Sequence, residues 1–256
     1  MCSTSGIIFG LRAMRESEVV GKRVLEVGAL DFNGGLRSVL VAYGPSEYIG
    51  VDLQAGPGVD VTCDVSKLVE SFGEESFDIV VNTELLEHVE HWRSAISNLK
   101  RVLRPGGVMV TTTRSPGFKY HGYPYDFWRF RPEDMRHIFC DFEILDLIPD
   151  PDAPGIFLKA RKPELFEENN LDDVELYSII TNRFENSVDA ESITRVQRNY
   201  LWRNRIRRAI IRPIDWVLKT IFSYQGETNL DDVELYSIIT NRFENSVDAE
   251  SARKPK

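Results

Sequence analysis

The stretch Lys22–Gly35 reads KRVLEVGALDFNGG, and it decides the fold that the sequence predicts. Its first half, Lys22–Gly28, is a short apolar run that ends in glycine, which is the pattern of a buried strand. Glycine lets the backbone turn tightly and approach a ligand closely. The second half of the stretch therefore predicts a ligand-binding loop at the end of a buried strand.

Strand and helix patterns alternate through the rest of the first 162 residues. Further strands are expected at 47–52, 58–63, 77–82, 108–113, 142–147 and 156–160, and helices at 35–43, 89–103 and 132–139. Strands that alternate with helices indicate βαβ units and a parallel sheet. We expect an α/β fold with a doubly wound, mostly parallel seven-stranded sheet, whose ligands bind at the carboxyl ends of the strands.

A change of composition at Lys162 and Pro163 predicts two parts, a domain of residues 1–162 and an extension of residues 163–256. The extension contains the sequence NLDDVELYSIITNRFENSVDAES twice, at 170–192 and at 229–251. These two acidic copies account for the net charge of −9, so the rest of the chain is close to neutral. A nearly neutral domain gives no support to a nucleic-acid partner.

Residues 195–222, between the two copies, are rich in Arg and contain the aromatic residues Tyr200, Trp202 and Trp216. Such a basic amphipathic stretch predicts peripheral contact with an anionic membrane. Docking on the first domain or on the acidic copies is one alternative, and contact with nucleic acid is the other. No apolar run reaches the length of a membrane span, and no secretory signal opens the chain. Together with three scattered cysteines, these features predict a cytoplasmic protein, with any membrane contact at the inner face.

The glycine spacing after the first strand is not that of the dinucleotide-binding G-x-G-x-x-G motif. With its preceding acid, it resembles instead the first motif of class I S-adenosylmethionine-dependent methyltransferases. Asp52 ends the second strand, where an acid can bind both ribose hydroxyls. Residues 101–107 also look like the family's segment before the fifth strand, and over residues 19–162 the chain resembles the type 11 methyltransferase family. The resemblance implies a Rossmann-like methyltransferase fold, and S-adenosylmethionine bound by Glu26, Gly28, Gly34, Asp52, Asp64, Val65, Asn82 and Glu84.

Two carboxylates and an imidazole follow the fourth strand, at Glu84, Glu87 and His88. On a helix their spacing would place them on one face, and these groups suit a divalent metal such as Mg, Mn or Fe. The run resembles the Glu-x-x-Glu-His metal site of ubiquinone-pathway O-methyltransferases and of terminal 2′-O-methyltransferases of small RNAs. The RNA enzymes add a further histidine, for which His121 is the match here. The alternative is that these residues contact the cofactor and cap a helix without metal.

The loop after the fifth strand, Phe118–Arg131, reads FKYHGYPYDFWRFR and is dense in aromatic residues. An aromatic wall can attract a sulfonium by cation–π contact. The loop resembles a stretch of type 11 methyltransferases linked to sugar and polysaccharide pathways. His121 and Asp126 are its groups suited to take a proton near neutral pH, so we expect them to be catalytic.

The sequence therefore predicts an S-adenosylmethionine-dependent enzyme that methylates oxygen on a small-molecule or glycan-linked acceptor. A nicotinamide-dependent reductase is one alternative, although it needs tighter glycine spacing and usually a Tyr-x-x-x-Lys pair. A non-catalytic binding module that keeps the methyltransferase fold is the other.

Overall fold

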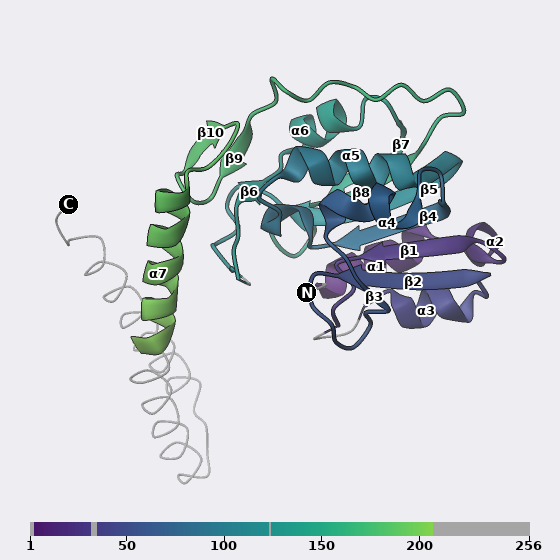
Figure 1. Cartoon of the computed structure of the whole chain (residues 1–256), viewed down its shortest axis with the longest axis horizontal. Helices are drawn as coiled ribbons and strands as arrows, with labels where there is room; N and C mark the ends of the chain where they lie inside the picture. Colours follow the sequence, from purple (N-terminus) through teal and green to yellow (C-terminus); the bar gives the residue numbers. More distant parts are fainter. Residues whose placement is uncertain (1–2, 32–34, 123, 207–256) are drawn as a thin grey trace, which may run out of the picture. The chain divides into compact units, whose positions relative to one another are not determined.

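The predicted sheet is present, and its seven strands pair in the order β3-β2-β1-β4-β5-β8-β7 (Figure 1). Strands β1 to β5 are parallel to one another, whereas β8 runs antiparallel to both β5 and β7. The strands are β1 Arg23–Val27, β2 Glu47–Asp52, β3 Val61–Thr62, β4 Phe77–Thr83, β5 Leu103–Arg114, β7 Glu143–Pro149 and β8 Gly155–Arg161. The α/β fold class expected from the sequence is therefore confirmed.

The structure is a computed structural model that describes residues 3–31, 35–122 and 124–206. Its chain divides into two compact units, Met1–Ser192 and Ile193–Lys256. The domain edge predicted at residue 162 stays a prediction, but the compact unit that contains the sheet continues to Ser192. The second acidic copy and the end of the basic stretch lie outside the described residues.

Helices cover the sheet on both faces. They are α1 Thr4–Ala13, α2 Glu16–Val19, α3 Arg37–Ala42, α4 Leu68–Phe72, α5 Trp92–Val102 and α6 Pro132–Ile138, with short 3₁₀ turns at η1 Val65–Lys67 and η2 Leu86–His88. Helices α4 and α5 lie together on the side of the sheet opposite α3 (Figure 1). The sequence analysis did not predict α1, which packs by stacking Phe9 on Phe157 of β8 with ring centroids 5.0 Å apart.

A second, small antiparallel sheet joins the aromatic loop to the first acidic copy. Its strands are β6 Trp128–Arg129, β9 Leu176–Ser178 and β10 Arg183–Glu185, in the order β10-β9-β6. Leu176 is fully buried in this sheet. The first acidic copy is therefore packed structure within the first unit as far as Ser192, and α7 Ala190–Ile206 begins in the last three residues of the copy.

The core is centred on β1 and β4, whose residues Leu25, Val80 and Val81 are fully buried. Strands covered on both faces need apolar side chains at successive positions, which explains the consecutive apolar residues VL at 24–25 and IVV at 79–81. Helix α5 adds Ile96 and Leu99 at helical spacing.

Two buried lysines tie the end of α5 to its surroundings. The Lys100 Nζ donates to both carboxylate oxygens of Asp141, at 2.8 and 2.7 Å, and to the Asn169 Oδ1 at 2.8 Å. The Lys162 Nζ donates to the carbonyl oxygens of Lys100 and Leu103, which lie at the end of the helix. Burial lowers the pKa of Lys100, and the charge and hydrogen bonds of Asp141 oppose that shift.

We expect Asp141→Ala to lower the free energy of unfolding by about 3–5 kcal/mol, because it leaves the Lys100 ammonium buried without its counter-ion. The double variant Lys100→Met/Asp141→Leu removes both charges and should recover most of that loss. Urea unfolding at pH 7 measures both values. Equal losses in the single and double variants would mean that the unpaired charge is not the source of the destabilisation.

Candidate active site

The carboxyl ends of β1, β4 and β5 lie side by side at the point where the strand order reverses. Val27 pairs in register with Asn82, and Asn82 pairs with Thr111. The chain leaves β1 toward β2 on one side, while β4 lies on the other. In open α/β sheets, ligands bind at this switch point. The residues that follow these strands are therefore the candidate site.

Gly28 begins the loop after β1 with φ +80°, a conformation that favours glycine. A Cβ atom there would lie 3.3 Å from the Leu85 Cδ1. Its N–H donates to the Val51 carbonyl at 2.9 Å, which fixes the start of the loop against β2. Gly34, also predicted to bind the cofactor, lies outside the described residues.

The predicted cofactor acids take three different environments. Asp52 is the last residue of β2, and its carboxylate accepts the N–H of Leu30 at 3.3 Å and of Gln54 at 3.1 Å, so it orients the glycine loop. The Asp64 carboxylate instead caps the 3₁₀ turn η1, where it accepts the Ser66 N–H at 2.8 Å beside the buried Val65.

Glu26 is 95% buried inside the strand end and accepts a hydrogen bond from the Tyr48 hydroxyl at 3.0 Å. Burial raises the pKa of Glu26 to about 7, although the Tyr48 hydrogen bond acts in the opposite direction. The same burial, with the charge of Glu26, raises the pKa of Tyr48. The side chain is therefore poised between its neutral and charged forms near neutral pH.

Asn82, at the end of β4, is fully buried, and its Nδ2 donates to the Thr111 Oγ1 at 2.8 Å. Its Oδ1 has no hydrogen-bond partner within the described part of the chain. A buried acceptor without a partner is costly in a folded protein, and a bound ligand can supply the missing donor.

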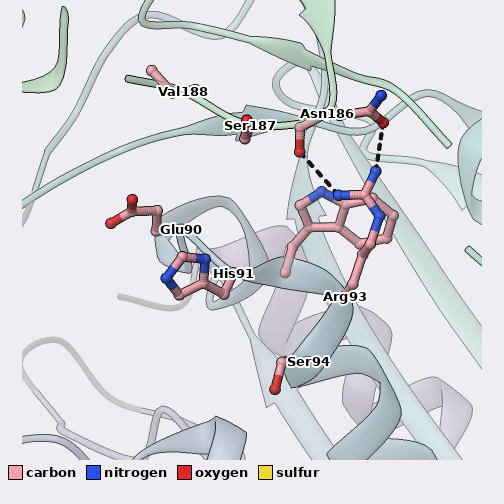
Figure 2. A pocket seen from close by; sticks show the side chains of 8 residues that line it. Glu90, His91, Arg93, Ser94, Asn186, Ser187 and Val188 are labelled. Carbon is pink, nitrogen blue, oxygen red and sulfur yellow. Dashed lines mark hydrogen bonds between the residues drawn. The ribbon is translucent and has the colours of Figure 1, made fainter. Parts of the chain in front are cut away.

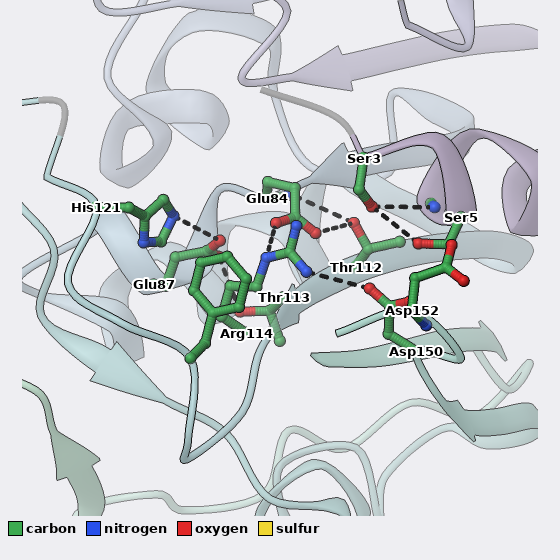
Figure 3. Close-up of polar contacts among 12 residues, drawn as sticks. Ser3, Ser5, Glu84, Glu87, Thr112, Thr113, Arg114, His121, Asp150 and Asp152 are labelled. Atoms are coloured by element: carbon green, nitrogen blue, oxygen red, sulfur yellow. Dashed lines mark hydrogen bonds and ion pairs between the residues drawn. The ribbon is translucent and has the colours of Figure 1, made fainter. Parts of the chain in front are cut away.

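Glu84 and Glu87 do not share a helix face, contrary to the sequence prediction. Glu84 has φ +53° and precedes the 3₁₀ turn that contains Glu87 and His88. Its carboxylate pairs with Arg114 and accepts the Thr112 hydroxyl at 3.1 Å (Figure 3). Burial, and then the charge of Glu87, raise the pKa of Glu84 to about 8. The change of backbone direction at Glu84 thus separates the two carboxylates.

His121 and Asp126, predicted to be catalytic, lie together in the aromatic loop. The His121 Nδ1 lies 2.8 Å from the Asp126 Oδ2, and its Nε2 lies 3.8 Å from the Glu87 Oε1 (Figure 3 shows the Glu87 contact). The fully buried Arg129 contacts both oxygens of Asp126, each at 2.6 Å. Burial alone would raise the pKa of Asp126, but the hydrogen bonds from Arg129 and His121 outweigh it and hold that pKa below its ordinary value.

Three of the four predicted metal ligands converge. One ligand atom each of Glu87, His88 and His121 lies within 4.8 Å of the others. Glu84 is not part of this group, since its carboxylate is paired with Arg114. His88 itself has its Nδ1 2.7 Å from the carbonyl oxygen of Tyr125, so only its Nε2 remains to face a metal.

Sequence reasoning missed the two arginines that hold the site. Arg114, the last residue of β5, pairs with Glu84 and with Asp150, and its guanidinium lies 4.2 Å from the Phe118 ring centroid. Arg129 supports Asp126. The sequence places Arg129 in the aromatic loop, but spacing alone does not identify Asp126 as its partner.

A family model described as a methyltransferase domain matches residues 25–111, which include the end of β1, all of β4 and most of β5. This part of the chain is a methyltransferase domain. The resemblance to class I S-adenosylmethionine-dependent methyltransferases, and to the type 11 family in particular, is thereby confirmed. The match covers the glycine loop and Glu84, but it ends before the aromatic loop.

Similar proteins of known name include the phthiotriol/phenolphthiotriol dimycocerosates methyltransferase of Mycobacterium leprae (strain TN), which is 31% identical over 52% of this chain and 53% of its own length. The ubiquinone biosynthesis O-methyltransferase of Parvibaculum lavamentivorans is 27% identical over 45% of this chain and 49% of its own. The chain thus spans about half the length of these relatives. The crystal structure of an S-adenosylmethionine-dependent methyltransferase from Mesorhizobium loti covers 61% of this chain and 98% of its own, with 20% identity and a TM-score of 0.48.

The raised pKa of Glu26 predicts a stability that depends on pH. The pKa of Glu26 is about 7 in the folded protein, above its ordinary value of 4.5, so the folded state binds the Glu26 proton more tightly than the unfolded state. The stability that this tighter binding contributes is fully present below pH 4.5 and is lost as the pH rises through 7. Glu26→Gln removes this titration. Relative to the unchanged protein, we expect the variant to gain about 3 kcal/mol in unfolding free energy between pH 4 and pH 8. Denaturant unfolding at both pH values tests this, and a constant difference would contradict it.

Proposed function

We propose that this protein is an S-adenosylmethionine-dependent methyltransferase that methylates a hydroxyl oxygen of a small-molecule, lipid-linked or glycan-linked acceptor. The observation that carries the proposal is the His121–Asp126 pair beside the ends of β4 and β5. A histidine oriented by a carboxylate is suited to remove a proton from a hydroxyl. The family match favours this activity over a reductase or a non-catalytic scaffold.

The strand ends fit the bound cosubstrate on three counts. Gly28 begins the loop after β1 with a positive φ that favours glycine, Asp52 offers a carboxylate at the end of β2, and Asn82 holds a buried acceptor without a partner among the described residues. Glu26, Asp64, Val65 and Glu84 complete the proposed contacts. When bound, S-adenosylmethionine supplies a methyl group on a positively charged sulfur.

The chain's own residues then position the acceptor and its proton. Asp126 holds the His121 Nδ1, so that Nε2 is left to accept the proton of a hydroxyl. Arg129 keeps Asp126 in its charged form, because its guanidinium contacts both carboxylate oxygens. The barrier is lowered further by holding the two reacting atoms in line, an effect worth roughly 7–11 kcal/mol at most.

The names of the relatives support oxygen and a lipid-like acceptor as the target class. One is an O-methyltransferase of ubiquinone biosynthesis, and the others act on phthiotriol or phenolphthiotriol dimycocerosates. Both matches cover about half of each relative, so the acceptor of this protein is part of the proposal.

Binding of a divalent metal by Glu87, His88 and His121 is a second possible role for this part of the site. Two imidazoles and a carboxylate suit Mn²⁺ or Fe²⁺, and their ligand atoms are already close together. A metal at the His121 Nε2 would occupy the atom that the first mechanism uses as the base. The two roles are therefore alternatives.

The proposal includes a cytoplasmic location and peripheral contact of residues 195–222 with the inner face of a membrane. Helix α7 covers the first part of this stretch and carries Arg195, Arg198 and Arg203. Within the described residues, no helix is long and apolar enough to cross a membrane. A peripheral enzyme of this kind would reach a lipid-linked acceptor without spanning the bilayer.

Calorimetric titration tests the cosubstrate directly. We expect S-adenosylmethionine to bind and NADPH not to bind. Asp52→Ala should weaken S-adenosylmethionine binding by about 1.5–3 kcal/mol, the scale of hydrogen bonds to a charged group. Asp31→Ala, which changes a neighbouring acid of the same loop, is the matched control and should bind more nearly as the unchanged protein does. Equal affinity for folded Asp52→Ala and unchanged protein would remove Asp52 from the site, and binding of NADPH alone would overturn the function.

The base and metal roles separate in a second experiment. Transfer of a labelled methyl group to a panel of phenolic and sugar hydroxyls is measured before and after EDTA treatment. If His121 is the base, His121→Gln lowers kcat by roughly 10²–10⁴-fold, Asp126→Asn lowers it less, and EDTA has no effect. Loss of activity with EDTA, restored by Mn²⁺ or Mg²⁺, would instead establish the metal role. Full activity of His121→Gln would exclude both roles.

A further inference from the structure

The extension carries two identical copies of one segment, and the first of them has a defined place in the fold. Residues 170–192 contain β9 and β10 and belong to the compact unit that ends at Ser192. The second copy, residues 229–251, lies outside the described residues. What holds the first copy therefore defines what a second segment of the same sequence can bind.

Arg93, in the first turn of α5, holds the first copy mainly through backbone groups. Its Nε donates to the Leu171 carbonyl at 2.8 Å, and its Nη2 donates to the Val174 carbonyl. Two further bonds reach the carbonyl and the side-chain Oδ1 of Asn186, at 2.9 and 2.7 Å. Arg93 and Asn186 both line a small pocket between the start of α5 and residues 186–188 (Figure 2). One guanidinium thus joins the two ends of the segment.

The middle of the first copy adds a strand to β6. Ser178 pairs with Trp128 and Tyr177 with Arg129, and the Ile179 N–H donates to the Phe127 carbonyl at 2.9 Å. The side chains that anchor this pairing are apolar and buried, namely Leu171, Leu176, Ile180 and Val188. Main-chain pairing supplies affinity and the apolar side chains supply register, as in other cases of strand addition.

We propose that this docking site, formed by Arg93 and β6, accepts either copy, so that residues 229–251 can take the place of residues 170–192. Every docking residue recurs in the second copy, as Leu230, Leu235, Ser237, Ile239, Asn245 and Val247. Identical segments have the same intrinsic affinity for one site and differ only in how they are tethered. The chain therefore carries one docking site and two segments that can bind it. This proposal does not depend on the proposed methyl transfer.

The tether favours the first copy. That copy follows directly on Asn169, whose N–H donates to Asp141 at 3.2 Å and whose Oδ1 accepts from Lys100. The second copy can reach the same site only if residues 170–228 form a loop. Closure becomes less probable as about the 3/2 power of loop length, so a loop of this size is disfavoured by roughly 450-fold against a direct connection. In the unchanged protein the first copy is docked, and the second replaces it when the first is impaired.

Hydrogen exchange of the full-length protein, followed by mass spectrometry, reports which copy is docked. Peptides that extend into residues 163–169 or 223–228 distinguish the two copies. In Leu176→Asp, which places an unpaired charge in the buried position of β9, we expect protection to leave residues 170–192 and to appear in residues 229–251. That new protection should be roughly 450-fold weaker than the protection of the first copy in the unchanged protein.

Two matched variants complete the experiment. Leu235→Asp changes the same position of the second copy and should leave the first copy protected as before. In the double variant Leu176→Asp/Leu235→Asp, neither copy should be protected, while β1 and β4 should remain protected. Arg93→Ala alters the docking site itself and should weaken the protection of whichever copy is docked.

Two results would overturn the proposal. The first is that Leu176→Asp keeps β1 and β4 protected but residues 229–251 still exchange as fast as in the unchanged protein. The other is protection of residues 229–251 that increases with protein concentration and accompanies dimerisation in light scattering, since the exchange would then take place between molecules. If Leu176→Asp loses protection in β1 and β4, Leu176→Ala replaces it and is judged by the same criteria.

Discussion

Two buried arginines make it possible for several carboxylates to share the end of one sheet. Arg114 pairs with Glu84 and Asp150, and Arg129 pairs with Asp126. Without these cations, the carboxylates would be desolvated and would repel one another, which costs several kcal/mol for each charge. The proposed base depends on this arrangement, because His121 is oriented by a carboxylate that Arg129 holds in place. The orientation of the proposed base therefore depends on the ion pairs of the site.

The sheet was predictable because its signals are local. The apolar residues VL at 24–25 and IVV at 79–81, and the glycine that follows the first of these strands, are consequences of burial on both faces and of a tight turn. The same reasoning placed Asp52 and Asn82 at strand ends. Helix α1 was not predicted, since its stability comes from packing Phe9 on a strand that lies far away in the sequence.

The site was predictable in its residue types and less so in its geometry. The spacing of Glu84, Glu87 and His88 suits a helix, but Glu84 takes a left-handed backbone conformation that no spacing rule reveals. Arg114 and Arg129 act through partners whose distance is set by the fold. Similarly, the acidic composition of residues 170–192 suggested a polar extension, whereas the buried Leu176 and Ile180 give it a packed place.

The pairing of β6 with β9 joins the proposed catalytic machinery to the extension. Arg129, which supports Asp126, sits in a two-residue strand whose neighbour in the small sheet is Tyr177. A chain that ended at residue 162 would keep the region that matches the methyltransferase family, yet it would expose β6 as an open strand edge. Open edges recruit strands from other molecules and promote aggregation. The smallest stable form of this protein should therefore be longer than the region that matches the family model, because residues beyond that region cover the edge of β6.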